Sequence, residues 1–217
     1  MKIKACIFDL DGVVVDTARY HYLAWKKIAD DLGFDFSEHD NERLKGVSRM
    51  ESLDILLGIG NIKADSATRE KLAGAKNNLY LSYIEQMTSD EILPGVMDFL
   101  DEFRRYGILT ALGSASKNAM TILDKIHIVK KFDAVIDGNK VTKVKPDPEV
   151  FLKGASELGV EPKNCLVFED AQAGIDAACN GGMHIIGIGH RENLKNAEYV
   201  IPGFEKMDLD LLRTWYQ

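Results

Sequence analysis

The hydrophobic pattern of this 217-residue chain changes after a first short apolar run. Cys6, Ile7 and Phe8 are consecutive apolar residues, a pattern typical of a strand buried on both faces of a parallel sheet. From Thr17 onward, apolar residues recur every three or four positions, which is the spacing of an amphipathic helix. No strand pattern occurs between residues 17 and 90, so this block is predicted to be helical throughout.

Three helical segments are predicted in this block. The first follows Thr17 and stops near Gly33, a residue that commonly ends helices. Helical spacing continues over 38–59, and one long helix is predicted over 65–87. The apolar stripe of the long helix comprises Leu72, Leu79, Tyr80 and Tyr83.

After residue 90 the two patterns alternate. Strands are predicted at 108–113, 134–136, 165–168, 184–188 and 199–201, and helices at 95–106, 117–128, 147–158, 171–181 and 207–216. Such alternation favours a parallel sheet with helices on both faces. The expected architecture is an α/β, doubly wound, Rossmann-like core (1–16 and 88–217) with an inserted α-helical cap (17–87).

Composition narrows the class of protein. The chain is 46% hydrophobic and 28% charged, which is ordinary for a soluble globular protein. Its net charge of −7 argues against nucleic-acid binding, and no stretch approaches the roughly 20 apolar residues of a membrane span. No broad exposed apolar pattern demands a dimer, so a monomer is expected.

The positions of the cysteines and the N-terminal sequence both favour a cytoplasmic location. Cys6, Cys165 and Cys179 form no disulfide framework, and the first two lie in strand-like apolar runs, so free thiols and a cytoplasmic location are expected. No signal peptide is expected either, because Asp9 and Asp11 interrupt the N-terminal apolar run.

Two carboxylates end the first predicted strand. Asp9 and Asp11 lie two residues apart, and Gly12 permits a tight turn after them. At least one acid can reach the carboxyl edge of the sheet, where open α/β sheets bind ligands. Two such charges need a cation or a shared proton, and oxygen donors beside a phosphate suit Mg²⁺. A solvated turn or a calcium loop has a similar string, but the buried strand argues against both.

Two polar motifs follow later strands. Ser114 lies at a predicted strand-to-helix turn, where a hydroxyl and free backbone N–H groups can bind an anion, although such clusters also serve as helix caps. Lys145 precedes Pro146, which restrains the loop so that one lysine can face a phosphate as a point charge. Lys143 is expected to be a surface charge.

A second pair of acids ends the strand at 165–168. Glu169 and Asp170 directly precede a predicted helix, so helix capping is one explanation for them. With Asp9 and Asp11 they bring four carboxylates to one edge of the sheet. A bare cluster of this kind would repel itself, which favours a bound Mg²⁺.

These four motifs, in this order and spacing, resemble those of the haloacid dehalogenase-like (HAD) phosphohydrolase superfamily, and the helical block resembles the cap of one of its subclasses. The resemblance implies an aspartyl-phosphate mechanism with Asp9 as the nucleophile and Asp11 as the general acid/base. It also implies that Asp9 and Asp170 ligate Mg²⁺ directly. Asp11 would contribute its backbone carbonyl, and Glu169 would complete or support the site.

The resemblance extends to the phosphate sites of the core. It implies catalytic roles for Lys145 and Ser114 and places the Ala115 backbone on the phosphoryl group that is transferred. The residues implied for the other phosphate of the substrate are Ser116, Lys117 and Asn118.

The cap contains a loop of distinct chemistry at residues 45–49. Gly46 allows a turn, and Lys45 and Arg49 supply cations, of which arginine can clamp a phosphate bidentately. A basic surface loop is the alternative. The string resembles the substrate loop of the sugar-phosphate mutases of the superfamily, which places Arg49 on the non-reacting phosphate. The implied substrate-binding residues of the cap are Thr17, Trp25, Lys45, Gly46, Val47, Ser48, Arg49 and Lys76.

The same resemblance implies that His21 lies next to Asp11 and couples cap closure to it, and that Lys76 lies near the sugar. The expected reaction interconverts β-D-glucose 1-phosphate and glucose 6-phosphate through an aspartyl phosphate. β-Glucose 1,6-bisphosphate is the expected intermediate and activator, Mg²⁺ the cofactor, and a phosphorylated hexose the partner. A sugar-phosphate phosphatase using Asp9 is the alternative. A catalytically silent phosphosugar-binding module is a third, against which the full set of motifs argues.

Overall fold

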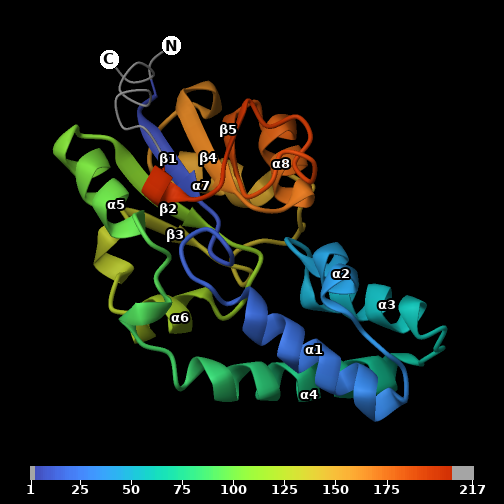
Figure 1. The fold of residues 1–217 in the computed structure, drawn as a ribbon. Helices are drawn as coiled ribbons and strands as arrows, with labels where there is room; N and C mark the ends of the chain where they lie inside the picture. The colour runs from blue at the N-terminus through green and yellow to red at the C-terminus, as the bar shows by residue number, and fades with distance from the viewer. Residues whose placement is uncertain (1–2, 207–217) are drawn as a thin grey trace.

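The structure, a computed structural model, describes residues 3–206 and consists of a parallel sheet flanked by helices and a separate group of helices below it (Figure 1). The strands are β1 (Ala5–Phe8), β2 (Leu109–Gly113), β3 (Ala134–Ile136), β4 (Cys165–Glu169), β5 (His184–Ile188) and β6 (Tyr199–Ile201). They lie in the order β3-β2-β1-β4-β5-β6, and all pair in parallel. The order reverses at β1, where such sheets bind ligands.

Apolar packing on both faces of the sheet explains why β1 is wholly apolar. Phe8 belongs to one buried cluster and Ile7 to the other, because successive side chains of a strand point to opposite faces. Two helices cover each face: α5 (Val96–Arg105) and α6 (Ala119–Lys125) the first, α7 (Glu149–Glu157) and α8 (Gln172–Asn180) the second. The predicted doubly wound α/β core is therefore confirmed.

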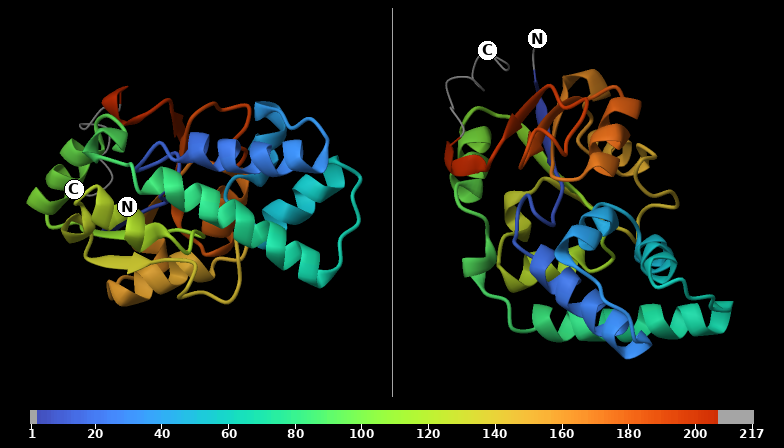
Figure 2. Two further views of the ribbon diagram at one scale, coloured as in Figure 1. Left: turned by 90° about the horizontal axis from the view of Figure 1, so that it is seen from below. Right: turned by 45° about the vertical axis from the view of Figure 1, so that its right-hand side comes forward.

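The cap consists of α1 (Ala18–Leu32), α2 (Glu38–Asn41), α3 (Arg49–Ile59) and α4 (Ser66–Ile84). α1 and α4 lie side by side in both views of Figure 2. The cap has an apolar core of its own, built around Trp25, Phe36 and Leu53. Within residues 3–206, every helix is too short or too polar to cross a membrane.

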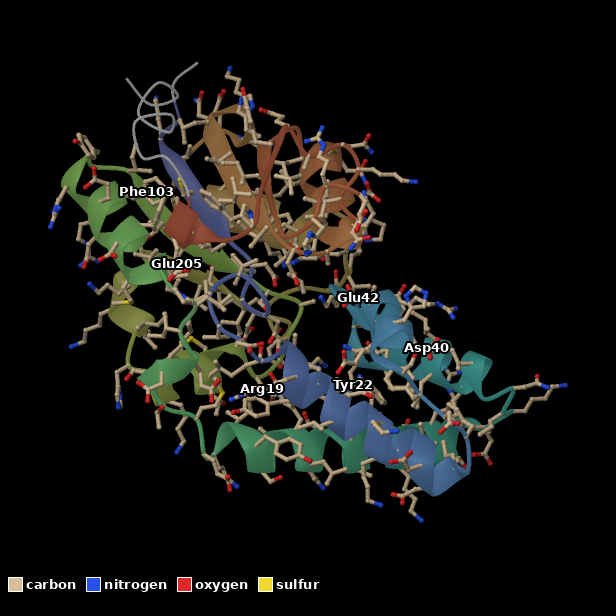
Figure 3. All side chains as sticks on the ribbon, viewed as in Figure 1. Arg19, Tyr22, Asp40, Glu42, Phe103 and Glu205 are labelled. Atoms are coloured by element: carbon tan, nitrogen blue, oxygen red, sulfur yellow. The ribbon has the colours of Figure 1, made fainter. Side chains whose placement is uncertain are left out.

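Two short segments join the cap to the core and pair with each other. Val15 and Ile92 form an antiparallel bridge, and the N–H of Asp16 donates to the carbonyl of Glu91 at 3.0 Å. Arg19, labelled at the start of α1 in Figure 3, contacts the Glu91 carboxylate at 2.5 Å. We propose that the domain boundaries lie at 16/17 and 87/88, within or beside these segments.

The helical spacing over 38–59 is divided by the cap loop, as the turn expected at Gly46 indicates. The chain forms α2, then the 3-10 turn η1 (Glu42–Leu44), and α3 begins only after an irregular stretch at 45–48. Gly46 has a φ of 72°, in the left-handed region that ends helices. Further 3-10 turns are η2 (Ser89–Glu91), η3 (Val129–Lys131), η4 (Pro162–Asn164) and η5 (Phe204–Lys206). The predicted helix at 207–216 lies outside the described residues.

Candidate active site

A cavity of about 460 Å³ lies between the cap and the carboxyl edge of the sheet. Most residues predicted to form the site line it: Asp9, Asp11, residues 114–118 and Asp170 from the core, and His21, Trp25, residues 45–49 and Lys76 from the cap. Three predicted residues lie behind its wall instead: Thr17, Lys145 and Glu169. The fold thus brings segments from the whole chain to one place.

Three carboxylates form the deepest corner of the site. One oxygen from each of Asp9, Glu169 and Asp170 lies within 4.8 Å of the others. Burial, and then the charges of Glu169 and Asp9, raise the pKa of Asp170 well above its ordinary value. A divalent cation would relieve this repulsion, and an all-oxygen donor set suits Mg²⁺. The cluster therefore fits the cation that the sequence predicts, and it does not include the carboxylate of Asp11.

Two glycines make room for this corner. Gly12 has a φ of 78°, and a Cβ there would overlap the Asp170 carboxylate. A Cβ at Gly174 on α8 would overlap the carboxyl group of Glu169 in the same way. Both carboxylates therefore occupy space that only glycine leaves free, which fixes their position at the end of β4.

The ammonium of Lys145 forms ion pairs with two of the buried carboxylates. Its Nζ lies 2.5 Å from Oδ1 of Asp9 and 2.8 Å from Oε2 of Glu169, and its side chain is fully buried. Burial alone would lower its pKa, but the charges of Asp9 and Glu169 outweigh burial and hold the pKa above its ordinary value. Lys145 is therefore a fixed cation beside Asp9. Lys143, in contrast, is exposed and pairs with Asp147 at 3.2 Å.

Asp11 occupies a different environment from Asp9. The hydroxyl of Thr17 donates to its Oδ1, and Thr17, although it is the N-cap of α1, makes no capping bond. Burial, and then the charge of Asp9, raise the pKa of Asp11 to about 6, against the Thr17 hydrogen bond. A carboxyl group that titrates near neutrality can act as both acid and base. Thr17, expected to bind substrate, is fully buried and instead holds Asp11.

His21 and Lys76 approach Asp11 from the cap. Lys76 Nζ lies 2.9 Å from His21 Nδ1, and because an ammonium only donates, Nδ1 is the acceptor. The ring proton then lies on Nε2, which faces Asp11 Oδ1 at 3.7 Å. Burial, and then the charges of Lys76 and Arg49, hold the pKa of His21 well below its ordinary value, so the ring is neutral. The cap therefore presents a neutral N–H donor to Asp11.

The loop after β2 has the chemistry of an anion site. Ser114 Oγ accepts from the N–H of Ser116 at 3.1 Å, and Ser116 Oγ accepts from the N–H of Asn118 at 3.2 Å. Since each hydroxyl oxygen is occupied as an acceptor, its hydrogen stays available to a phosphate. Asn118 Nδ2 also donates to Asn77 Oδ1 of α4 at 3.0 Å, so this loop contacts the cap.

The cap loop at 45–49 reaches the core near the carboxylate corner. Lys45 Nζ lies 3.0 Å from Glu42, which Figure 3 labels at the core-facing end of the cap, and 3.8 Å from Asp170. Burial lowers the pKa of Arg49, which lines the cavity. The loop therefore carries one cation beside the acids and another in the cavity.

Sequence reasoning missed several residues of the site. The sequence pattern predicts Tyr80 only as part of an apolar stripe, yet its ring packs against His21 with the ring centroids 4.2 Å apart. Its position four residues after Lys76, on the same helix face, was the signal. Asn41, Ser52 and Val141 also line the cavity, and the sequence gives no motif for them.

Comparisons with known proteins agree with this geometry. Residues 3–182 match the model of the haloacid dehalogenase-like hydrolase family. The chain is 40% identical to the β-phosphoglucomutase of Bacillus subtilis, over 99% of this chain and 96% of that protein. It is 29% identical to a phosphorylated carbohydrates phosphatase of Thermotoga maritima, over 88% of each.

A solved structure also resembles this chain over its whole length. The crystal structure of β-phosphoglucomutase from Clostridium difficile matches with a TM-score of 0.93 and 44% identity, covering 99% of this chain and 97% of that one. Its likeness covers the sheet and the cap together, since nearly all of both chains is matched. The chain therefore belongs to the haloacid dehalogenase-like hydrolase family.

Proposed function

We propose that this chain catalyses the β-phosphoglucomutase reaction, the interconversion of β-D-glucose 1-phosphate and glucose 6-phosphate. The observation that carries the proposal is a single cavity with anion-binding groups at two places. One is the corner at Asp9, with Lys145 buried directly behind it, and the other has Arg49 and Lys117, which both line the cavity. A substrate with two phosphates needs both places, whereas hydrolysis of one phosphate needs only the first. The activity named for the Bacillus subtilis relative supports this reading.

In the proposed reaction, Asp9 carries a phosphoryl group as an aspartyl phosphate. The C6 hydroxyl of β-glucose 1-phosphate attacks the phosphorus, the bond to Asp9 breaks, and β-glucose 1,6-bisphosphate forms. This intermediate turns over in the cavity, and Asp9 then takes the C1 phosphoryl group, which releases glucose 6-phosphate and regenerates the aspartyl phosphate. Each cycle therefore restores the phosphorylated enzyme.

Asp11 moves the protons in both halves of this cycle. It accepts the proton of the attacking C6 hydroxyl and later donates a proton to the oxygen that leaves from C1. The pKa of about 6 lets it exist in both forms near neutral pH. The Thr17 hydroxyl holds it by a hydrogen bond, and Nε2 of His21 lies 3.7 Å from its Oδ1, so we expect the acid/base to depend on the start of the cap.

Asp9, Glu169, Asp170 and the backbone carbonyl of Asp11 are the groups that would hold Mg²⁺. When bound, Mg²⁺ offsets the negative charge of the transferring phosphoryl group, which is the main source of catalysis in phosphoryl transfer. Lys145 contributes a second, permanent charge at Asp9. Ser114 and the Ala115 backbone would bind the remaining phosphoryl oxygens.

The cap decides between a sugar hydroxyl and water as the acceptor. Water would hydrolyse an aspartyl phosphate, so the mutase requires a closed cavity. Arg49 from the cap and Lys117 from the core would grip the non-reacting phosphate together with Ser116 and Asn118. A bound bisphosphate thus links the two parts of the molecule and holds the cap closed.

A sugar-phosphate phosphatase with the same Asp9 chemistry is the second candidate. The relative from Thermotoga maritima, whose name states a phosphatase activity, is the observation that favours it. The two functions differ only in the acceptor of the phosphoryl group. Both require Asp9, so loss of activity in an Asp9→Asn variant separates each of them from a silent binding module.

One assay with two readouts tests the proposal. The protein is incubated with Mg²⁺, β-glucose 1-phosphate and a trace of β-glucose 1,6-bisphosphate, and glucose 6-phosphate and free phosphate are followed together. We expect glucose 6-phosphate with little free phosphate, and no turnover by Asp9→Asn. Free phosphate as the main product would identify a phosphatase and overturn the proposal.

A further inference from the structure

We propose that Tyr80 is a positioning residue for Asp11, and that its hydroxyl holds the Asp11 carboxyl group in place for proton transfer. This inference rests on the role proposed for Asp11. Tyr80 lies on α4 of the cap, and its side chain is fully buried. The polar groups that its hydroxyl faces are Thr17 and Asp11.

The ring of Tyr80 is fixed on two sides. His21 packs against it at a tilt of 46°, with the ring centroids 4.2 Å apart, and Lys76 Nζ lies 4.6 Å from its centroid. These are the two cap residues that also face Asp11. The phenol is therefore held at the acid/base site by contacts that need only its ring, which leaves the role of the hydroxyl to be explained.

The Tyr80 hydroxyl has no hydrogen-bond partner among the described residues, although it is buried. A buried polar group without a partner lowers stability, and a phenyl ring at this position would avoid that cost. Thr17 already donates to Oδ1 of Asp11, and no hydrogen bond from the described residues reaches its Oδ2. If the Asp11 carboxyl group turns toward Tyr80, it gives this hydroxyl a partner.

The chemistry of a phenol suits this task better than that of its neighbours. Asp11 must be a carboxylate before it accepts the proton from the sugar and a carboxylic acid before it donates one. A hydroxyl donates to the first form and accepts from the second, whereas the ammonium of Lys76 can only donate. Tyr80 can therefore follow Asp11 through the cycle without leaving its place.

The test compares two variants that remove one hydroxyl each. Tyr80→Phe keeps the ring and its contacts with His21 and Lys76. Tyr83→Phe is the matched control, since Tyr83 lies on the same helix and stacks on Tyr20, with ring centroids 5.6 Å apart, outside the cavity. The readouts are kcat, KM, the ratio of glucose 6-phosphate to free phosphate, and the melting temperature.

For Tyr80→Phe we expect kcat to fall roughly ten- to a hundredfold, part of the 10²–10⁴ that a general acid/base contributes, with KM within about twofold. The product ratio should fall as well, because attack by the sugar hydroxyl depends on a well-placed base. The melting temperature should not fall, since an unpartnered hydroxyl is removed. Tyr83→Phe should retain wild-type kcat.

Two results would overturn the inference. One is a Tyr80→Phe variant with wild-type kcat and product ratio. The other is a loss of kcat that comes with a lowered melting temperature, which would assign the hydroxyl to stability alone. If the wild type itself forms no glucose 6-phosphate, the proposed function has failed, and this outcome is recognised before the variants are compared.

Discussion

Lys145 and Asp9 form a fully buried ion pair, with Nζ 2.5 Å from Oδ1, although residue 145 lies far from residue 9 in the sequence. The same ammonium reaches Glu169 at 2.8 Å. One permanent cation thus lies between two of the three carboxylates that would hold the metal. These contacts link the ends of β1 and β4 to the loop before α7, so Asp9, the proposed nucleophile, is held in place before any ligand binds.

Replacing this ammonium with an apolar chain of similar length should harm both folding and catalysis. Lys145→Met leaves Asp9 and Glu169 buried without a counter-charge, which typically costs about 3–5 kcal/mol of unfolding free energy. Urea denaturation should show this loss in Mg²⁺-free buffer and a smaller loss with Mg²⁺. The control is Lys143→Met, which alters an exposed lysine and should match the wild type. Equal stability of both variants without Mg²⁺ would contradict the assignment.

Arg49 is expected to grip the non-reacting phosphate. Arg49→Ala should therefore lower kcat/KM for the mutase reaction by at least about a hundredfold, close to 3 kcal/mol. The fraction of product that appears as free phosphate should rise, because the cap is less firmly closed. Arg43→Ala, an exposed arginine of the same segment, serves as the control. A mutase rate that is unchanged by Arg49→Ala would favour the phosphatase alternative.

Gly46 brings the cap loop against the core. Its φ is 72°, and a Cβ there would lie 2.9 Å from the Cβ of Ala171 at the start of α8. Gly46→Ala should therefore push the loop off the core and lower kcat/KM about tenfold, or 1.4 kcal/mol. Gly33→Ala has a similar backbone strain but no neighbour within 4 Å, so only its stability should fall. Steady-state kinetics of the two variants separate the effect of the Gly46–Ala171 contact from the effect of backbone strain. Equal kcat/KM values for Gly46→Ala and Gly33→Ala would show that this contact has no role.

Lys76 should make stability depend on pH. Burial, and then the charge of Arg49, lower its pKa from 10.5 to about 7. Between these values the unfolded chain holds one more proton than the folded chain, so stability rises with pH, by up to about 1.4 kcal/mol per unit. The wild type should therefore gain more stability between pH 7 and 9 than Lys76→Met does. Lys71→Met, exposed on the same helix, should retain the wild-type slope. Identical slopes in all three proteins would show that Lys76 keeps its ordinary pKa.

The strands and the carboxylate motifs could be predicted from the sequence because they are local. Each apolar run that ends in Asp, Ser or Glu became a strand of the sheet, and parallel strands place their carboxyl ends at one edge. Gly46 indicates the cap loop, but helical spacing on both sides of it leaves the start of the next helix open. Ser48 and Glu51 carry the signal for that start, because Ser48 Oγ accepts from the N–H of Glu51 as the N-cap of α3.

The contacts between elements could not be predicted. Tyr80 fits the apolar stripe of α4 equally well as a core residue and as a neighbour of the acid/base. Only the packing of α1 against α4 decides between the two, since it places the His21 ring against the Tyr80 ring. Thr17 is a similar case: its place before a helix predicts a cap, but its hydroxyl is bound to Asp11. The periodicity of apolar residues predicts which face of a helix is buried, but it does not predict which element packs against that face.

The central claim is that Asp9 carries the phosphoryl group and delivers it to a sugar hydroxyl in preference to water. The most direct measurement labels the enzyme with radioactive β-glucose 1,6-bisphosphate in the presence of Mg²⁺, locates the label by mass spectrometry, and then follows its release. We predict that the label lies on Asp9, is absent from Asp9→Asn, and passes rapidly into hexose bisphosphate when glucose 6-phosphate is added. Label on another residue, or its release as free phosphate at a rate that added sugar phosphate does not change, would contradict the account.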